Sequence, residues 1–449
     1  MKWTLLYGEY TSIPRRALTV GNFNYLLNLM HDLEGHLRKP SEYENMFLFF
    51  RNMAFQQFWL EHEFNMLDFA RQSVLFGKLD PAHRFQASFL EKAGIPLPQF
   101  IELAMMLMTR FTVEKKGSVT PEWFRTVVKA YEAGTIERFL TFLSADITTL
   151  RVKLGQTRDP NRKVSYEVYE KSPLREMPLL EYHGVYYPFS PQLLARSLET
   201  KIYDTLRKDD PQGFMNTFGP IFERYVGGSL SNIGAPVIPE QELARVVPSV
   251  GKLVDYLVVD GETTVFIDAK GVEMSYLGMV GHQPEVIKDK TGNSIIKGIE
   301  QALGTASRLE GINEIAGVPI RNGNKYLIVV TFKDMFVGNG IDFYEYVAKE
   351  TLDRIVSRYA GAAPIPFGHM YFVSVDDFDM MVSAIVSGAT DLTRLLQQAV
   401  ADDALAATKK FTFGQHVRKI CPEVESPKWL YDESKSILDR CACRFDKKP

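Results

Sequence analysis

Cysteine is scarce in this chain of 449 residues. The three that are present, Cys421, Cys441 and Cys443, all lie near the C-terminal end of the sequence. Their number and spacing provide neither a disulfide framework nor a four-ligand zinc site. We therefore expect the protein to work in a reducing compartment.

Long apolar runs are missing as well. The N-terminal stretch MKWTLLYGEY contains an apolar run shorter than the core of a signal peptide. No later segment approaches the roughly 18 to 20 apolar residues that a membrane span requires. The sequence therefore predicts a cytoplasmic protein without a membrane partner.

A strong excess of charge of one sign is also absent. The formal net charge is -3, and 45% hydrophobic with 24% charged residues is typical of folded globular chains. A nucleic-acid partner would have to bind a local basic surface. The length predicts two or three domains.

The first part of the chain has a helical period. Between residues 22 and 131 the apolar positions recur every three or four residues, which predicts an all-helical region. The polar stretch KLGQTRDPNRKVSYEVYEKS follows at residues 153–172 and is typical of a boundary. We expect a helical N-terminal domain over 1–155, with a sensing, regulatory or partner-binding role, and a linker over 156–173.

The pattern changes after two further helices. The segment from residue 189 is expected to begin a helix capped by Ser190, with Pro191 in its first turn, and a second helix is expected to close at Gly227 and Gly228. Period-two segments then predict three strands, followed by a helix and a fourth strand, near Phe332. The expected α/β domain spans 174–395 and is followed by a C-terminal tail over 396–449.

Three charged residues interrupt two of these strands. They are Asp255, Asp268 and Lys270 in VGKLVDYLVVDGETTVFIDAKG. An ionised group taken out of water costs several kcal/mol unless something pairs with it. Asp268 and Lys270 are two residues apart, so on one strand they share a face.

The turn between the strands decides whether Asp255 joins them. Asp260–Gly261 is a strong two-residue turn signal, and that turn would pair Asp255 with Phe266, diagonal to Asp268. A four-residue loop over 260–263 would set Asp255 directly opposite Asp268. A three-residue loop would place the two acids on opposite faces.

Two converging carboxylates repel each other unless a cation lies between them. Mg²⁺ suits such a site because it accepts one or two carboxylates, several waters and phosphate oxygens. The ammonium of Lys270 could stabilise charge on an attacked phosphate, which favours phosphodiester hydrolysis. The alternative is a structural ion pair between Asp255 and Lys270, with Asp268 in solvent.

With these residues inside this order of elements, the chain resembles the PD-(D/E)xK nuclease superfamily over roughly residues 210–332. The resemblance implies a restriction-endonuclease-like α/β core: a mixed sheet flanked by helices, in the order helix, three strands, helix, strand. Two positions depart from the pattern. Val254 replaces the proline, and the acid of the third strand is an aspartate.

The resemblance also implies roles for individual residues. Asp255 and Asp268 match the metal ligands, Lys270 matches the catalytic lysine, and the carbonyl of Ala269 would be a backbone ligand. Glu223 matches an acid that some members add to the metal site, and Gln301 matches a glutamine that supports it.

Two lysines are expected to contact nucleic acid. Lys297 lies four residues before Gln301 on the same helix, where some members carry an active-site lysine, and Lys252 precedes the first acid.

The sequence thus predicts a Mg²⁺-dependent nuclease, in which Mn²⁺ can substitute. A DNA endonuclease is favoured over an enzyme acting on RNA, and the resemblance suggests a role in defence against foreign DNA. A protein partner of the helical domain and a homo-oligomer are both compatible with the sequence. The alternative is an inactive nuclease-like scaffold that binds nucleic acid or a protein partner.

Overall fold

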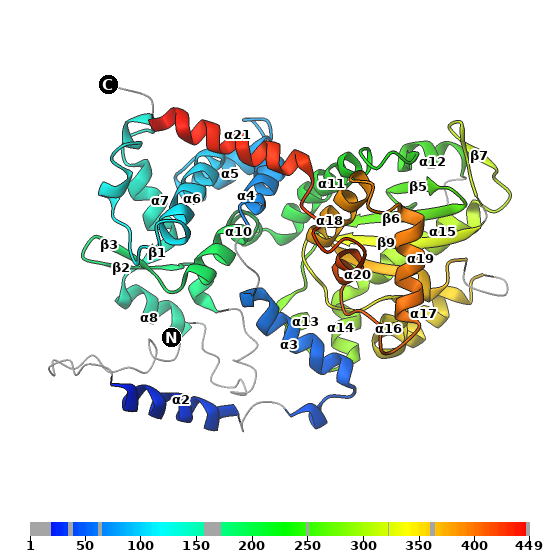
Figure 1. Cartoon of the computed structure of the whole chain (residues 1–449), viewed down its shortest axis with the longest axis horizontal. Coiled ribbons are helices and arrows are strands. Elements are labelled where there is room, and N and C mark those ends of the chain that lie inside the picture. Colours follow the sequence, from blue (N-terminus) through cyan, green and yellow to red (C-terminus); the bar gives the residue numbers. More distant parts are fainter. Residues whose placement is uncertain are drawn as a thin grey trace. The chain divides into compact units, whose positions relative to one another are not determined.

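The protein is a mixed α/β chain that divides into two compact units (Figure 1). The computed structural model describes residues 19–34, 39–61, 65–156, 172–247, 251–321, 323–359 and 364–445. Met1–Thr205 and Ser436–Pro449 form the first unit, called the helical unit, and Leu206–Lys435 form the second, called the sheet unit.

The helical unit confirms the helical period of the N-terminal sequence up to residue 112. A short mixed sheet follows, in which β1 is parallel to β2 and β2 is antiparallel to β3. The elements are α2 (Val20–Glu34), α3 (Met46–Glu61), α4 (Leu67–Gln72), α5 (Arg84–Ala93), α6 (Leu97–Thr112), α7 (Thr135–Leu143), β1 (Ser144–Ala145), α8 (Ile147–Gln156), β2 (Leu179–Tyr182), β3 (Val185–Pro188) and α10 (Pro191–Arg207).

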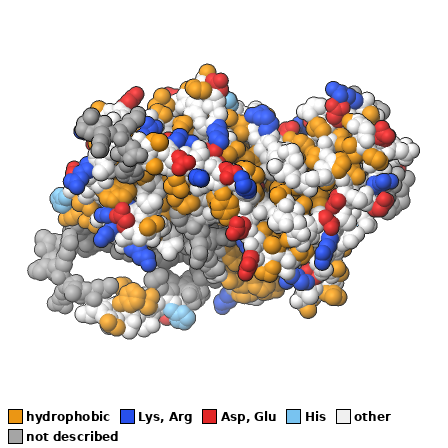
Figure 2. All heavy atoms as spheres, turned by 45° about the horizontal axis from the view of Figure 1, so that its top comes forward, with side chains coloured by type: hydrophobic (Ala, Val, Ile, Leu, Met, Phe, Trp, Pro, Cys, Tyr) orange, Lys and Arg blue, Asp and Glu red, His pale blue; other side chains and the backbone are white. Residues whose placement is uncertain are grey.

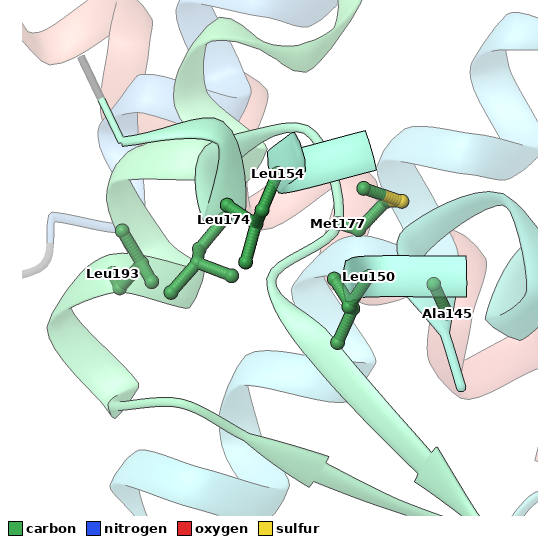
Figure 3. Packing of buried hydrophobic residues seen from close by; sticks show 6 residues of the cluster. All are labelled: Ala145, Leu150, Leu154, Leu174, Met177 and Leu193. Atoms are coloured by element: carbon green, nitrogen blue, oxygen red, sulfur yellow. The ribbon is translucent and has the colours of Figure 1, made fainter. Parts of the chain in front are cut away.

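The division between the units differs from the expected domain boundary at 156–173. Residues on both sides of that segment pack into one apolar cluster of the helical unit, which Figure 3 shows. Its members are Ala145, Leu150, Leu154, Leu174, Met177 and Leu193. Together with the pairing of β1 and β2, this cluster holds residues 172–205 in the helical unit. Residues 157–171 of the expected linker lie outside the described residues.

The sheet unit contains the expected order of helix, three strands, helix and strand, with added helices between them. Its elements are α11 (Pro211–Leu230), β4 (Val237–Pro239), α12 (Glu240–Val246), β5 (Tyr256–Asp260), β6 (Thr263–Lys270), α13 (Tyr276–Val280), α14 (Pro284–Thr291), the π-helical turn η6 (Gly292–Ile296), α15 (Lys297–Arg308), β7 (Glu314–Ile315), β8 (Val318–Pro319), β9 (Asn324–Thr331), α16 (Gly340–Phe343), η7 (Tyr344–Ala348), α17 (Lys349–Val356), β10 (Met370–Ser374), α18 (Val375–Val386), α19 (Leu392–Asp403) and α20 (Phe413–Ile420).

The main sheet has the strand order β10-β9-β6-β5-β4. The strands β4, β5 and β6 are antiparallel neighbours, whereas β6, β9 and β10 run parallel. The long crossover from β6 to β9 carries α15, as a parallel pair requires. The carboxyl ends of β6, β9 and β10 therefore meet at one edge of the sheet.

Helices cover both faces of this sheet (Figure 1). On one face α15 packs against β6 and β9, and its Gly298 lies against Asp268. On the other face α11 packs against β6, and the Tyr256 hydroxyl donates a hydrogen bond to the carbonyl of Glu223 on α11 at 3.0 Å. Tyr256 pairs with Ile267, the neighbour of Asp268, so the two helices lie on opposite faces.

The hairpin turn differs from the Asp260–Gly261 turn that the sequence suggested. Asp260 pairs with Thr263 and Val259 with Thr264, so Gly261 and Glu262 form the turn. Gly261 has φ of 57°, which suits a tight hairpin turn with glycine in its first central position. The register is thus the one expected for the four-residue loop over 260–263.

Two helix ends test the expected caps. The Ser190 side chain accepts a hydrogen bond from the Leu193 N–H at 3.0 Å, which confirms it as the cap of α10. The expected end of α11 at Gly227 and Gly228 is wrong, because the helix continues to Leu230. A Cβ at Gly227 would lie 2.3 Å from the Tyr256 hydroxyl, so this glycine makes room for a neighbouring ring.

The described part of the expected C-terminal tail is mainly helical, and the tail contributes to both units. Residues 396–435 belong to the sheet unit and residues from Ser436 onward to the helical unit, a division that falls within α21 (Lys428–Phe445). The three cysteines are free. Within the described part of the chain, no helix has both the length and the apolar character needed to cross a membrane.

Candidate active site

The three charged residues of the hairpin meet at the end of β6. The pairs Leu257 with Phe266 and Tyr256 with Ile267 set the register, and Asp255 directly precedes β5, so continuing this register by one residue would bring it opposite Asp268. Opposite residues in an antiparallel pair share a face, and Lys270 lies on that face two residues further along. We call Asp255, Asp268 and Lys270 the acidic site.

Hydrogen bonds and an ion pair hold these side chains in place. The Lys270 Nζ lies 2.5 Å from Asp268 Oδ2 and donates to Gln301 Oε1 at 3.0 Å. The Gln301 Nε2 donates to the carbonyl of Leu253 at 2.8 Å. Asp255 Oδ2 accepts a hydrogen bond from the backbone N–H of Ala269 at 2.6 Å. Gln301 therefore connects the lysine to the segment that leads into β5.

The structural alternative expected an ion pair of Asp255 with Lys270 and a solvated Asp268. The ion pair of Lys270 is instead with Asp268, whose side chain is fully buried. Both carboxylate oxygens of Asp268 are out of contact with solvent, and hydrogen bonds with Lys270 and with the Asp255 carboxyl act to lower the pKa of Asp268. Two buried carboxyl groups in contact repel each other when both are ionised, so the pair needs a shared proton or a cation.

Burial and mutual repulsion raise the pKa values of the carboxyls. Burial raises the pKa of Asp255 to about 7, and the Asp268 carboxylate is the second cause. Burial also raises the pKa of Asp268, although Lys270 and Lys297 act in the opposite direction. Such paired shifts are typical of functional sites and also occur in structural ion-pair networks.

Glu223 lies close enough to act electrostatically on the site. Burial raises its pKa, and the Glu240 and Asp268 carboxylates add to the effect. However, α11 packs on the face of the sheet opposite to the acidic site. Among the described residues, no group of three or more His, Cys, Asp or Glu side chains is arranged to hold a metal ion. The metal-binding role of Glu223 stays a prediction.

The two lysines expected to bind nucleic acid differ in position. Lys297, at the start of α15, is partly buried and acts on the charge of Asp268. Lys252 is exposed, and its carbonyl accepts a hydrogen bond from Arg308 at 3.1 Å. On the face shown in Figure 2, basic and acidic side chains are interspersed and form no large basic patch.

Sequence reasoning missed three residues that support the site. The Glu240 N–H donates to the carbonyl of Asp255 at 2.8 Å, and the Val254 N–H donates to Thr305 Oγ1 at 3.3 Å. Gly298 lies against Asp268 Oδ2. Only the glycine left a signal in the sequence, because glycine inside a helical pattern often has a packing reason.

Comparison with family models gave no match, and comparison with curated proteins gave none either.

Proposed function

We propose that this protein is a metal-dependent nuclease that hydrolyses phosphodiester bonds of nucleic acid at the acidic site, with DNA as the favoured substrate. One observation carries the proposal. Asp255 Oδ2 accepts a hydrogen bond from the Ala269 N–H at 2.6 Å, which holds this carboxylate next to Asp268, whose side chain is fully buried and paired with Lys270.

The donor set fits a hard divalent cation. Mg²⁺ takes oxygen ligands and keeps several waters, so two carboxylates are sufficient. Asp255 and Asp268 would hold the ion, and the Ala269 carbonyl remains the proposed backbone ligand. When bound, Mg²⁺ or Mn²⁺ would offset the charge of both acids, polarise a phosphate oxygen and lower the pKa of a coordinated water.

The remaining residues of the proposed site would orient the catalytic lysine and bind the phosphates of the substrate. Lys270 is held by Asp268 and Gln301, so its ammonium lies beside the Asp268 carboxylate, where it would stabilise charge on an attacked phosphate. Gln301 keeps that lysine in place through the Leu253 carbonyl. Lys297 and Lys252 would contact phosphates along the substrate.

A cleavage assay tests the proposal. Purified protein is incubated with duplex DNA, single-stranded DNA or RNA, in Mg²⁺, Mn²⁺ or EDTA, beside Asp268→Asn and Lys270→Ala. Asp289→Asn and Lys290→Ala serve as matched controls, because these residues form an exposed ion pair on α14. We expect metal-dependent cutting that both site variants lose and both controls keep.

Two outcomes would contradict the proposed nuclease function. One is equal cutting by wild type and both site variants, which would indicate a contaminant. The other is no cutting of any of the three substrates. If the protein still retards nucleic acid in a gel, the non-catalytic scaffold becomes the better description.

A further inference from the structure

Gly298 occupies a position where glycine weakens the structure locally. The π-helical turn η6 ends at Ile296 and α15 begins at Lys297, so Gly298 lies inside a continuous helical stretch. Glycine in a helix interior is less favourable than alanine because it loses more backbone freedom on folding. A requirement for space can explain its presence.

The surroundings of Gly298 show such a requirement. A Cβ there would lie 2.9 Å from Asp268 Oδ2 and 3.0 Å from Val329 Cγ2. Asp268 and Val329 are register partners on β6 and β9, so Gly298 rests on both strands at once. Gly304 on the same helix differs, because its Cβ would meet only Arg308 and Tyr359 at 3.5 and 3.6 Å. These are ordinary contact distances.

The oxygen that crowds Gly298 is also the oxygen that pairs with the lysine. Lys270 Nζ lies 2.5 Å from the same Oδ2 of Asp268. A methyl group at residue 298 would push this oxygen away from the helix and disturb its distance to Lys270. The orientation of the Asp268 carboxylate therefore depends on the absence of a side chain at residue 298.

We propose that Gly298 is a positioning residue for Asp268. Because it has no Cβ, α15 can approach β6 closely and the Asp268 carboxylate keeps its orientation toward Lys270 and Asp255. Its consequence for metal binding rests on the proposed nuclease function, whereas the contact itself does not. The two parts are therefore tested separately.

Melting temperatures test the contact without any metal. Gly298→Ala is measured in the wild type, in Asp268→Ala and in Val329→Ala, with Gly304→Ala as the matched control. We expect Gly298→Ala to lower the Tm most in the wild type, less in Val329→Ala, and least in Asp268→Ala. Gly304→Ala should not lower the Tm. An equal decrease in all three backgrounds, or a decrease relieved only by Val329→Ala, would overturn the proposal.

Binding of Mn²⁺, followed by electron paramagnetic resonance, tests the consequence in the folded variants. We expect about tenfold weaker binding for Gly298→Ala, the size typical of groups that orient a metal ligand, and unchanged binding for Gly304→Ala. Equal binding by Gly298→Ala and wild type would overturn the role in metal binding. Failure of the wild type to bind Mn²⁺ would overturn the proposed function, and the Tm comparison would still decide whether Gly298 positions Asp268.

Discussion

Gln301 Oε1 accepts a hydrogen bond from Lys270 Nζ at 3.0 Å, while Gln301 Nε2 donates to the Leu253 carbonyl at 2.8 Å. One amide thus joins the charged end of β6 to the segment that leads into β5. Both of its bonds are largely removed from solvent, so neither can be replaced freely by water.

Replacing this amide should affect both stability and activity. We expect Gln301→Ala to lower the free energy of unfolding by about 1–3 kcal/mol, because it leaves the Leu253 carbonyl without its donor. Cleavage should decrease because Lys270 loses one of the two groups that hold it. Urea unfolding and the cleavage assay measure the two effects. Gln212→Ala, which removes an exposed amide on α11, is the control, and equal effects would contradict the prediction.

The link between Tyr256 and α11 gives a second prediction. Burial raises the pKa of Tyr256 to about 12, with Glu223 as the second cause, so the hydroxyl remains a donor at neutral pH. Tyr256→Phe keeps the ring beside Gly227 and removes only the bond to the Glu223 carbonyl. We expect a loss of about 0.5–1.5 kcal/mol in unfolding free energy. Tyr187→Phe, at an exposed residue on β3, should change little.

An acid outside the acidic site, Asp334, should make the stability of the protein depend on pH. Burial raises its pKa to about 8, and the carboxylates of Asp377 and Asp376 add to the effect. A raised pKa means that the folded state holds the proton more tightly than the unfolded state. The stabilisation is therefore complete below the unfolded pKa of about 4 and is lost as the pH rises through about 8.

Asp334→Asn should remove this dependence because an amide does not ionise. Thermal melting between pH 5 and pH 9 should show a smaller decrease in Tm for Asp334→Asn than for the wild type. Asp432→Asn, at an exposed residue of α21, should follow the wild type. Parallel pH curves for wild type and Asp334→Asn would refute the assignment.

The C-terminal helix is held to the helical unit by a buried acid. The Glu102 carboxylate is 2% exposed and lies 3.3 Å from Arg440 Nε and 3.2 Å from Arg444 Nη2. The Tyr131 hydroxyl donates to it at 3.2 Å. Removing the charge leaves two arginines without their common partner.

We expect Glu102→Gln to destabilise the helical unit by about 3 kcal/mol, since breaking a buried ion pair is far costlier than breaking an exposed one. Hydrogen exchange of the backbone amides in α6 and α21 should accelerate. Glu122→Gln is the matched control, because Glu122 pairs with Arg125 in an exposed ion pair. If the backbone amides of α6 and α21 exchange at the same rate in both variants, Glu102 does not hold α21 to the helical unit.

Much of the hairpin follows from local sequence. Short apolar runs specify β5 and β6, and the glycine and acids between them form the turn at Gly261 and Glu262 that pairs them. The shared face of Asp268 and Lys270 needs nothing beyond the two-residue period of a strand. The order of elements around the hairpin was likewise readable from the change of period.

The long-range contacts could not be predicted from the local sequence. The turn moved by one residue because the pairing of Asp260 with Thr263 depends on the whole strand register. Helix α11 continues past Gly227 because the ring of Tyr256, distant in sequence, fills the space beside that glycine. The two units divide after Thr205 and not near 156–173, because the apolar cluster joins residues from both sides of that segment.

The sequence by itself therefore determined the elements, the alternation of faces and the identity of the charged residues, because these depend on neighbours within a few positions. Only the tertiary structure decided that Gln301 holds Lys270 and that Gly298 makes room for the Asp268 carboxylate. Each of these contacts joins residues of α15 or β6 through packing in three dimensions, and no local pattern encodes such distances.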